Sequence, residues 1–316
     1  MTTNPITPPS EPLQPRPTES SARRVFIGPN GLRAGWRLLI YLAIMSGLAA
    51  IVGLVFRLFG YTPKLAGGQM TPSKLALLEG IILFYSGGAA LIMSRIEGRK
   101  FAAYGLPLSK ALSSDFWVGI LWGFLTTSAT LLAIFLLHGV QLSGPTIHGT
   151  TLVTSAVAWT LTFLLVGLSE EFSFRGYSQA TLASGIGFWP AAFVLSAAFG
   201  LAHTGNSGEN ILGESSVVLF GLLFCLFLRR RGNLWFAVGF HMGFDWGQTF
   251  FYGVPDSGLL PYHNFLSATF SGPRWLTGGT VGPEASIFTP IALLLVGIIF
   301  HFKYREARYV PLKTDN

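Results

Sequence analysis

Long apolar stretches separated by short polar segments dominate the chain from about Trp36 onward. Many of them approach the ~20 residues that an α-helix needs to cross a ~30 Å hydrocarbon core. The pattern predicts about eight membrane-spanning helices, at 36–58, 75–94, 116–138, 152–182, 188–205, 211–228, 233–252 and 286–302. The expected fold is therefore all-α, a polytopic bundle of transmembrane helices.

The composition agrees with a bilayer environment. Hydrophobic residues make up 50% of the chain and charged residues 11%, against roughly 25% charged residues in an average soluble domain. The net charge of +7 would favour a nucleic-acid partner only if the basic residues gathered on a soluble surface, and here they punctuate the apolar runs. We expect a multi-pass protein of a cell membrane (plasma or inner), surrounded by lipid and binding no nucleic acid.

The distribution of Lys and Arg predicts the topology, because cytoplasmic loops carry an excess of both. Only Lys64, Lys74 and Arg274 fall in the predicted loops on one side. The loops and tails of the other side hold Arg16, Arg23, Arg24, Arg33, Arg37, Arg95, Arg99, Lys100, Lys110, Arg229, Arg230, Arg231, Lys303, Arg305, Arg308 and Lys313. Both termini should then be cytoplasmic.

Composition also divides the chain into regions. Residues 1–30 are rich in Pro, Thr, Ser and Glu and predict a disordered N-terminal tail. Residues 31–150 form N-terminal transmembrane helices, 151–255 a core that holds most of the unexpected polar residues, and 256–316 an extracytoplasmic loop, the last transmembrane helix and a basic tail. The single cysteine, Cys225, excludes an intrachain disulfide.

Charged side chains inside predicted spans indicate function, because each costs at least ~2.5 kcal/mol at the bilayer centre. Candidate positions fall in four places, which are Glu170–Arg175 in the fourth span, Phe199–His203 in the fifth, His241–Asp245 in the seventh, and Glu209 with Glu214 around the start of the sixth. The last pair is expected at the interfacial edge. The other three segments form the candidate site.

Helical spacing predicts partners within these segments, since residues four apart share one face. Glu171 should pair with Arg175, which leaves Glu170 to face the bundle interior. His241 and Asp245 should share a face in the same way. At 1.5 Å per residue, Glu170 and His203 lie roughly 18 and 22 Å from a cytoplasmic turn near 183–187, so their depths match. This match requires the fourth helix to continue past Arg175 to about residue 182.

Such a cluster suits amide hydrolysis. Glu170 with His203 could deprotonate a trapped water and return the proton to the leaving amine. His241 is the best candidate donor to the developing oxyanion. Asp245 would orient that imidazole or, if protonated, donate a hydrogen bond itself.

The three segments resemble the CPBP family of intramembrane glutamic peptidases, which includes CAAX prenyl endopeptidases and bacteriocin self-immunity proteins. The family motif EExxxR is met by Glu170, Glu171 and Arg175, and the motif FxxxH by Phe199 and His203. A third motif, HxxxN, is approached by His241 and Asp245. The departure at Asp245 replaces an obligate amide donor by a group that donates only when protonated.

The resemblance implies that residues 151–255 are a CPBP-like catalytic core, in which Glu170 and His203 activate water and His241 stabilises the oxyanion. Glu171, Arg175 and Phe199 would support these groups. It implies no metal and no organic cofactor. The expected partner is a membrane-associated peptide or protein substrate, either a CAAX-type prenylated peptide or a bacteriocin or regulator; the oligomeric state stays open.

Three alternatives compete with this interpretation. A metal-dependent membrane hydrolase could use Glu170, His203, His241 and Asp245 as zinc ligands, although no HExxH helix is present. An ion transporter also buries Glu, His and Asp, but here these residues are predicted to lie at one level. A non-catalytic bacteriocin-immunity protein could keep the same fold.

Overall fold

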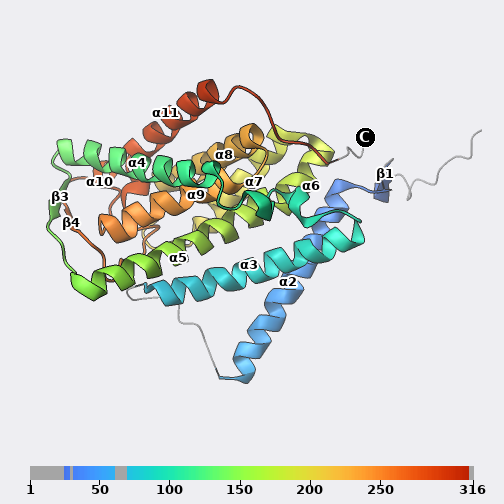
Figure 1. Ribbon diagram of the computed structural model, residues 1–316, viewed down its shortest axis with the longest axis horizontal. Helices are drawn as coiled ribbons and strands as arrows, with labels where there is room; N and C mark the ends of the chain where they lie inside the picture. The colour runs from blue at the N-terminus through green and yellow to red at the C-terminus, as the bar shows by residue number, and fades with distance from the viewer. Residues whose placement is uncertain (1–24, 29–30, 61–69, 313–316) are drawn as a thin grey trace, which may run out of the picture.

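The computed structural model describes residues 25–28, 31–60 and 70–312, and a helix lies at each of the predicted ranges (Figure 1). The helices are α2 (Ala34–Leu58), α3 (Pro72–Ile96), α4 (Ser114–Leu136), α5 (Gly149–Arg175), α6 (Tyr177–Ile186), α7 (Phe188–His203), α8 (Ile211–Arg231), α9 (Trp235–Asp245) and α11 (Phe288–Lys303). The predicted all-α polytopic membrane bundle is confirmed. Most of the predicted tail 1–30 lies outside the described residues.

The helices differ in their capacity to span a bilayer. Five described segments are long and apolar enough to cross a membrane, namely α2, α3, α4, α8 and the combined stretch Gly149–Ile186. Two further apolar helices, α7 and α11, are shorter. The remaining predicted span consists of α9 followed by the π-helical segment η3 (Trp246–Phe251). The number of spans and the cytoplasmic placement of the termini therefore stay predictions.

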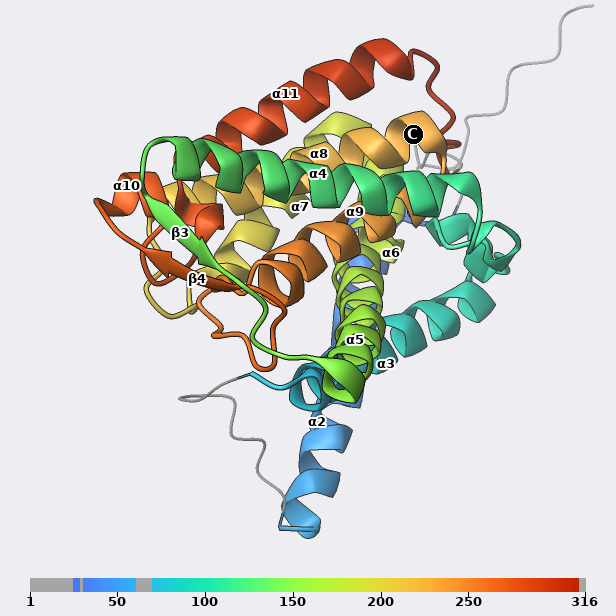
Figure 2. The ribbon, with the colours of Figure 1, turned by 60° about the vertical axis from the view of Figure 1, so that its left-hand side comes forward.

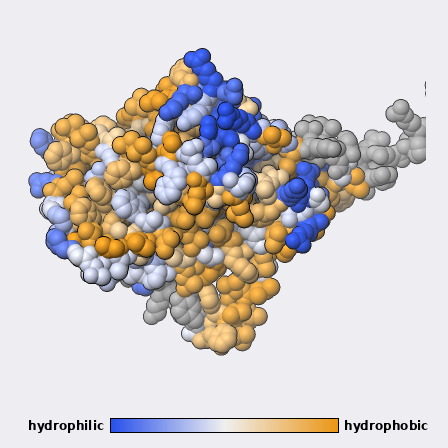
Figure 3. Space-filling view, viewed as in Figure 1, coloured by the Kyte–Doolittle hydropathy of each residue, from blue (hydrophilic) through white to orange (hydrophobic). Residues whose placement is uncertain are grey.

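Helix α2 contacts the bundle mainly through its first turns. Its buried residues are Ala34, Arg37 and Tyr41, and the Tyr41 ring stacks on Tyr177 of α6. The rest of α2 slopes away from the other helices (Figures 1 and 2). It exposes apolar side chains, among them Ile51, Leu54 and Leu58. Apolar residues also cover most of the face seen in Figure 3. Such a surface is expected where lipid is the solvent.

The centre of the bundle is the close contact between α4 and α9, which rests on two facing pairs of glycines. A Cβ atom at Gly123 of α4 would lie 1.9 Å from the Phe240 carbonyl oxygen, and one at Gly243 of α9 would lie 2.1 Å from the Ile120 carbonyl oxygen. Gly119 and Gly239, four residues earlier on each helix, meet the opposite backbone in the same way. Reciprocal GxxxG pairs of this kind let membrane helices approach backbone to backbone.

The prediction of one continuous helix over 152–182 is wrong at one residue. Helix α5 ends at Arg175 and α6 begins at Tyr177, with Gly176 between them at ψ −115°. A Cβ atom at Gly176 would lie 2.4 Å from the Phe172 carbonyl oxygen, so the break needs a residue without a side chain. The chain stays helical on both sides of the break, up to Ile186.

The segment between η3 and α11 is an ordered cover, a feature that the sequence did not predict. Its strand β4 (Ser267–Phe270) pairs antiparallel with β3 (Val140–Ser143) (Figure 2). The short helices α10 (Arg274–Thr277) and η4 (Pro283–Ala285) follow. The remaining short elements are β1 (Ile27–Gly28), β2 (Gly31–Leu32), η1 (Phe101–Tyr104) and η2 (Leu108–Lys110). The cover packs onto the bundle, and the Met70 amide donates to the Leu260 carbonyl.

Candidate active site

A cavity of about 400 Å³ lies between α3, α5, α7, α8, α9 and the cover. Its walls are apolar side chains, among them Phe163, Phe220 and Phe244. The ionisable residues that line it are Glu79, Glu170, His203, His241, Asp245, Asp256 and Glu284. The four residues that the sequence proposed as catalytic therefore come together in one cavity, from three different helices.

His241 is the centre of the polar network. Its Nδ1 lies 3.1 Å from Glu171 Oε1, and its Nε2 lies 3.4 Å from Asp245 Oδ2 and 3.7 Å from Glu170 Oε2. Because an ionised carboxylate only accepts, Nδ1–H donates to Glu171. The ring can therefore present a hydrogen to the cavity only through Nε2. The predicted shared face of His241 and Asp245 is confirmed.

Glu171 connects the network to Arg175. The predicted ion pair is present, with Arg175 Nη1 3.5 Å from Glu171 Oε1, and both side chains are fully buried. The same oxygen, Oε1, accepts from His241 Nδ1. We expected Asp245 to orient the imidazole. Glu171 instead holds Nδ1 from the neighbouring helix, while Asp245 lies at Nε2.

Phe199 supports both the arginine and the second histidine. The Arg175 guanidinium lies over the Phe199 ring, 4.2 Å from its centroid. The same ring makes an edge contact with His203 at 4.6 Å. A cation that rests on an aromatic face is stabilised electrostatically. The contact between Phe199 and Arg175 therefore holds the FxxxH segment beside the Glu171–Arg175 pair.

His203 is oriented by its own helix. Its Nδ1 donates to the Phe199 carbonyl oxygen at 2.8 Å, because a carbonyl can only accept. The neutral ring then keeps a lone pair on Nε2. No ion pair joins His203 to Glu170 among the described contacts, and both residues line the same cavity.

The sequence interpretation missed Glu79 on α3. This carboxyl group is buried, with 4% of the residue exposed, and it accepts a hydrogen bond from the Ser169 hydroxyl. It lines the cavity together with Glu170, the neighbour of Ser169. A lone carboxylate within the apolar span 75–94 carries the same insertion cost that singled out Glu170. The sequence therefore contained a signal for this residue.

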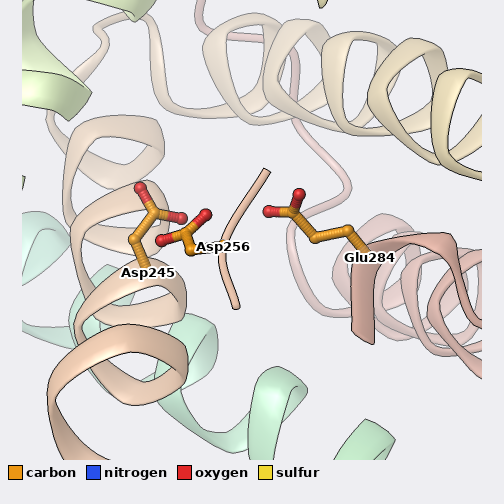
Figure 4. Close-up of side chains that lie close together, drawn as sticks. All are labelled: Asp245, Asp256 and Glu284. Carbon is orange, nitrogen blue, oxygen red and sulfur yellow. The ribbon is translucent and has the colours of Figure 1, made fainter. Parts of the chain in front are cut away.

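Two more carboxyl groups come from the cover. Asp245, Asp256 and Glu284 point toward one another (Figure 4), with carboxylate oxygens within 4.8 Å. Asp256 accepts from the Thr249 hydroxyl at 2.7 Å, and Glu284 accepts from the Ser257 hydroxyl at 2.8 Å. Burial, together with the charge of Asp256, raises the pKa of Glu284 to about 8, and burial raises the pKa of Asp256. No sequence periodicity marks these positions.

This cluster of three carboxyl groups is the one set among the described residues that could hold a metal ion. Its donors are all oxygens, a set that suits Mg²⁺, Ca²⁺ or Mn²⁺ better than zinc. It differs from the zinc set considered from the sequence, with which it shares only Asp245. Glu209 and Glu214 lie at the start of α8 and do not line the cavity.

The comparison with known families agrees with the site. Residues 152–247 match the family model described as type II CAAX prenyl endopeptidase Rce1-like. The core of this chain is Rce1-like. No curated protein matches the chain. The match confirms the resemblance to the CAAX-protease group and indicates a protease of the endopeptidase type in a membrane bundle.

The Rce1-like core contains all of the predicted site residues, from Glu170 on α5 to Asp245 on α9. Glu79, Asp256 and Glu284 lie outside it, on α3 and on the cover. The Rce1-like core therefore supplies the motif residues, and the flanking segments complete the cavity around them.

Proposed function

We propose that the protein is a glutamic-type intramembrane endopeptidase that needs no metal and cleaves a membrane-associated peptide or protein. The observation that carries this proposal is the shared cavity, in which Glu170 and His203 face one space between apolar helices. The cavity has a volume of about 400 Å³, which is enough for several water molecules, since each occupies ≈ 30 Å³ in the liquid. Glu170 is the most accessible of the groups around His241, with 22% of its side chain exposed.

The proposed reaction uses a water between Glu170 and His203. The Glu170 carboxylate accepts a proton from this water while His203 Nε2 accepts its other hydrogen as a hydrogen bond. The water oxygen attacks the carbonyl carbon of the scissile peptide bond. The C–N bond then breaks, and Glu170 returns its proton to the leaving amine nitrogen.

The oxyanion requires a hydrogen-bond donor. His241 Nε2 is available because Glu171 holds Nδ1, and it donates when the ring is an imidazolium. Asp245 lies beside Nε2 and acts as a second donor in its protonated form. Glu171 and Arg175 position His241 and do not contact the substrate.

A peptide-hydrolysis assay on purified protein in proteoliposomes tests the proposal. Glu170→Gln and His203→Ala should each lower kcat by ~10²- to 10⁴-fold, the usual contribution of general acid–base catalysis. Glu214→Gln, a matched carboxyl substitution outside the cavity, should leave kcat unchanged. Full activity in Glu170→Gln would refute the assigned base.

A metal-dependent hydrolase is the second candidate, because Asp245, Asp256 and Glu284 could hold a divalent cation beside His241. We expect wild-type hydrolysis to continue after exhaustive treatment with EDTA, since the proposed base and donors are side chains. Loss of activity in EDTA that Mg²⁺, Ca²⁺ or Mn²⁺ restores would favour the metal enzyme.

A further inference from the structure

A second cavity, of about 330 Å³, lies at the end of the bundle opposite the cover. It is bounded by the segment after α3, the junction of α5 and α6, the end of α8 and the chain that follows α11. That last segment runs back from α11 toward α6 (Figure 1), and its Tyr309 ring packs on Phe188. We call this cavity the end pocket; its polar lining residues are Arg99, Tyr104, Arg175 and Tyr309. Among the described residues, it shares no lining residue with the active-site cavity.

The end pocket has a positive charge that does not depend on protonation, because arginine stays charged in proteins. Arg99 and Arg175 line it, and no Asp or Glu stands among the described residues of its lining. Two carboxylates contact these arginines from outside the lining. Glu97 lies 3.1 Å from Arg99 and 3.0 Å from Arg37, and Glu171 lies 3.5 Å from Arg175. Three guanidinium groups thus share two carboxylates, which leaves an excess of one positive charge even when both carboxylates are ionised.

Arg175 has an unused hydrogen-bonding edge. Its Nη1 contacts Glu171, whereas its Nε and Nη2 are buried and make no hydrogen bond among the described residues. Nε–H and Nη2–H form one edge of the planar guanidinium, a fork that fits two oxygens of a phosphate or carboxylate group. The Tyr309 hydroxyl is also buried without a partner in the described part of the chain. Buried donors are almost always paired in native proteins, so these donors indicate a ligand that accepts from them.

The end pocket lies at the level where lipid headgroups are expected. Its walls come from places where long apolar helices end, at Ile96 in α3 and at Arg231 in α8. Lipid phosphates lie just outside the hydrocarbon core, and basic pockets between transmembrane helices bind them. The volume of about 330 Å³ is roughly tenfold that of one water, which occupies ≈ 30 Å³ in the liquid. The pocket therefore admits a phosphate group together with waters that hydrate it.

We propose that the end pocket binds a phosphate group through the guanidinium groups of Arg99 and Arg175 and the hydroxyl of Tyr309. Arg175 donates from its free edge to two phosphate oxygens, and Arg99 and Tyr309 donate from the segments after α3 and α11. The phosphate belongs to a lipid headgroup or is free in solution, two sources with the same recognition chemistry. Binding needs no hydrolysis, so the proposal does not depend on the peptidase function.

Calorimetric titration of the full-length protein, purified in a phosphate-free maltoside detergent, tests both sources. One titrant is sodium phosphate and the other is a short-chain phosphatidic acid, and we expect saturable binding of at least one. Arg99→Gln and Tyr309→Phe should each raise the Kd at least ~10-fold, because each removes a hydrogen bond to a charged group. Binding of phosphatidic acid alone would identify a lipid headgroup as the ligand, and binding of sodium phosphate would show that a free phosphate suffices.

Arg95→Gln is the matched control. Arg95 lies in the last turn of α3, at the same end of the bundle, and does not line the end pocket. The substitution removes the same charge, so the Kd should change at most ~2-fold, through screened long-range attraction. Tyr309→Phe complements Arg99→Gln, because it keeps the ring contact with Phe188 and leaves the Arg99–Glu97 pair intact.

Size-exclusion chromatography of each variant establishes that it is folded before the titration. Absence of binding of both titrants to the wild type would overturn the proposal. Equal Kd values for wild type, Arg99→Gln and Tyr309→Phe would also overturn it. An equal loss of affinity in Arg95→Gln and Arg99→Gln would do the same, because it would assign the binding to the general charge of this end and not to the pocket.

Discussion

Removal of one partner from the buried pair Glu171–Arg175 should destabilise the protein strongly, and the chain contains an exposed pair at the same separation for comparison. Arg175 and Glu171 are 3.5 Å apart with both side chains fully buried. Arg308 and Glu306 are also 3.5 Å apart, with 57% and 82% of their side chains exposed. At this separation the attraction is ~5 kcal/mol at an effective dielectric constant near 20 and ~1 kcal/mol in water. The two pairs share this separation and differ strongly in burial.

Glu171→Gln removes the charge and keeps the size of the side chain. It leaves the Arg175 guanidinium buried without a carboxylate, a change that typically costs about 3–5 kcal/mol. Glu306→Gln should cost at most ~1 kcal/mol. At ~2–4 °C per kcal/mol, Glu171→Gln should lower the apparent Tm of the detergent-purified protein by on the order of 10 °C. Equal Tm values for the two variants would contradict a stabilising role of the buried pair.

The double variant Glu171→Gln/Arg175→Met separates stability from catalysis. Replacing the orphaned cation by an apolar side chain of similar length should recover most of the lost Tm. Hydrolysis should stay low, because no carboxylate then holds Nδ1 of His241. Recovery of both Tm and kcat would show that Glu171 does not position the imidazole.

Two further predictions concern the cover and the centre of the bundle. The pKa of Glu284 is raised from 4.5 to about 8 in the folded protein. In the unfolded chain this carboxyl group ionises above about pH 4.5, whereas in the folded protein it stays protonated up to about pH 8. The free energy of unfolding is therefore greatest below about pH 4.5 and falls, by on the order of a few kcal/mol, as the pH rises to about 8. Glu284→Gln should flatten this decline in Tm measured between pH 5 and 9, and an unchanged slope would contradict burial of an ionisable group there. Gly123→Val should abolish monodisperse protein in size-exclusion chromatography, because its Cβ would overlap the Phe240 carbonyl oxygen. Gly53→Val on α2, where a Cβ meets nothing within 4 Å, is the control and should leave the elution profile unchanged.

Contacts within one helix could be predicted from the sequence. The pairs Glu171–Arg175 and His241–Asp245 follow from i,i+4 geometry, which depends only on the helical repeat. The helix ranges follow from apolar runs in the same way. These predictions needed no knowledge of how the helices pack.

Contacts between helices could not be predicted in this way. The bond from His241 Nδ1 to Glu171 depends on the rotation of α9 against α5, which Gly167 permits because a Cβ there would lie 2.9 Å from the Val238 carbonyl oxygen. Asp256 and Glu284 reach the cavity because the cover folds back onto the bundle. The cover has no regular apolar pattern, so its sequence does not indicate that it folds back onto the bundle. Glu79 could have been predicted from the sequence. It is a charged residue within an apolar span, and the insertion cost that identified Glu170 applies to it equally.

The cavity is assembled from distant segments, which limits how short a transplanted part of the chain can be. Its ionisable lining begins at Glu79 and ends at Glu284, well beyond the matched residues 152–247 on both sides. A fragment cut to the matched residues would keep every motif side chain and lose three of the carboxyl groups that line the cavity. Conversely, an exchange of α3 and the cover would change the walls of the cavity while the motif side chains of residues 152–247 stay in place.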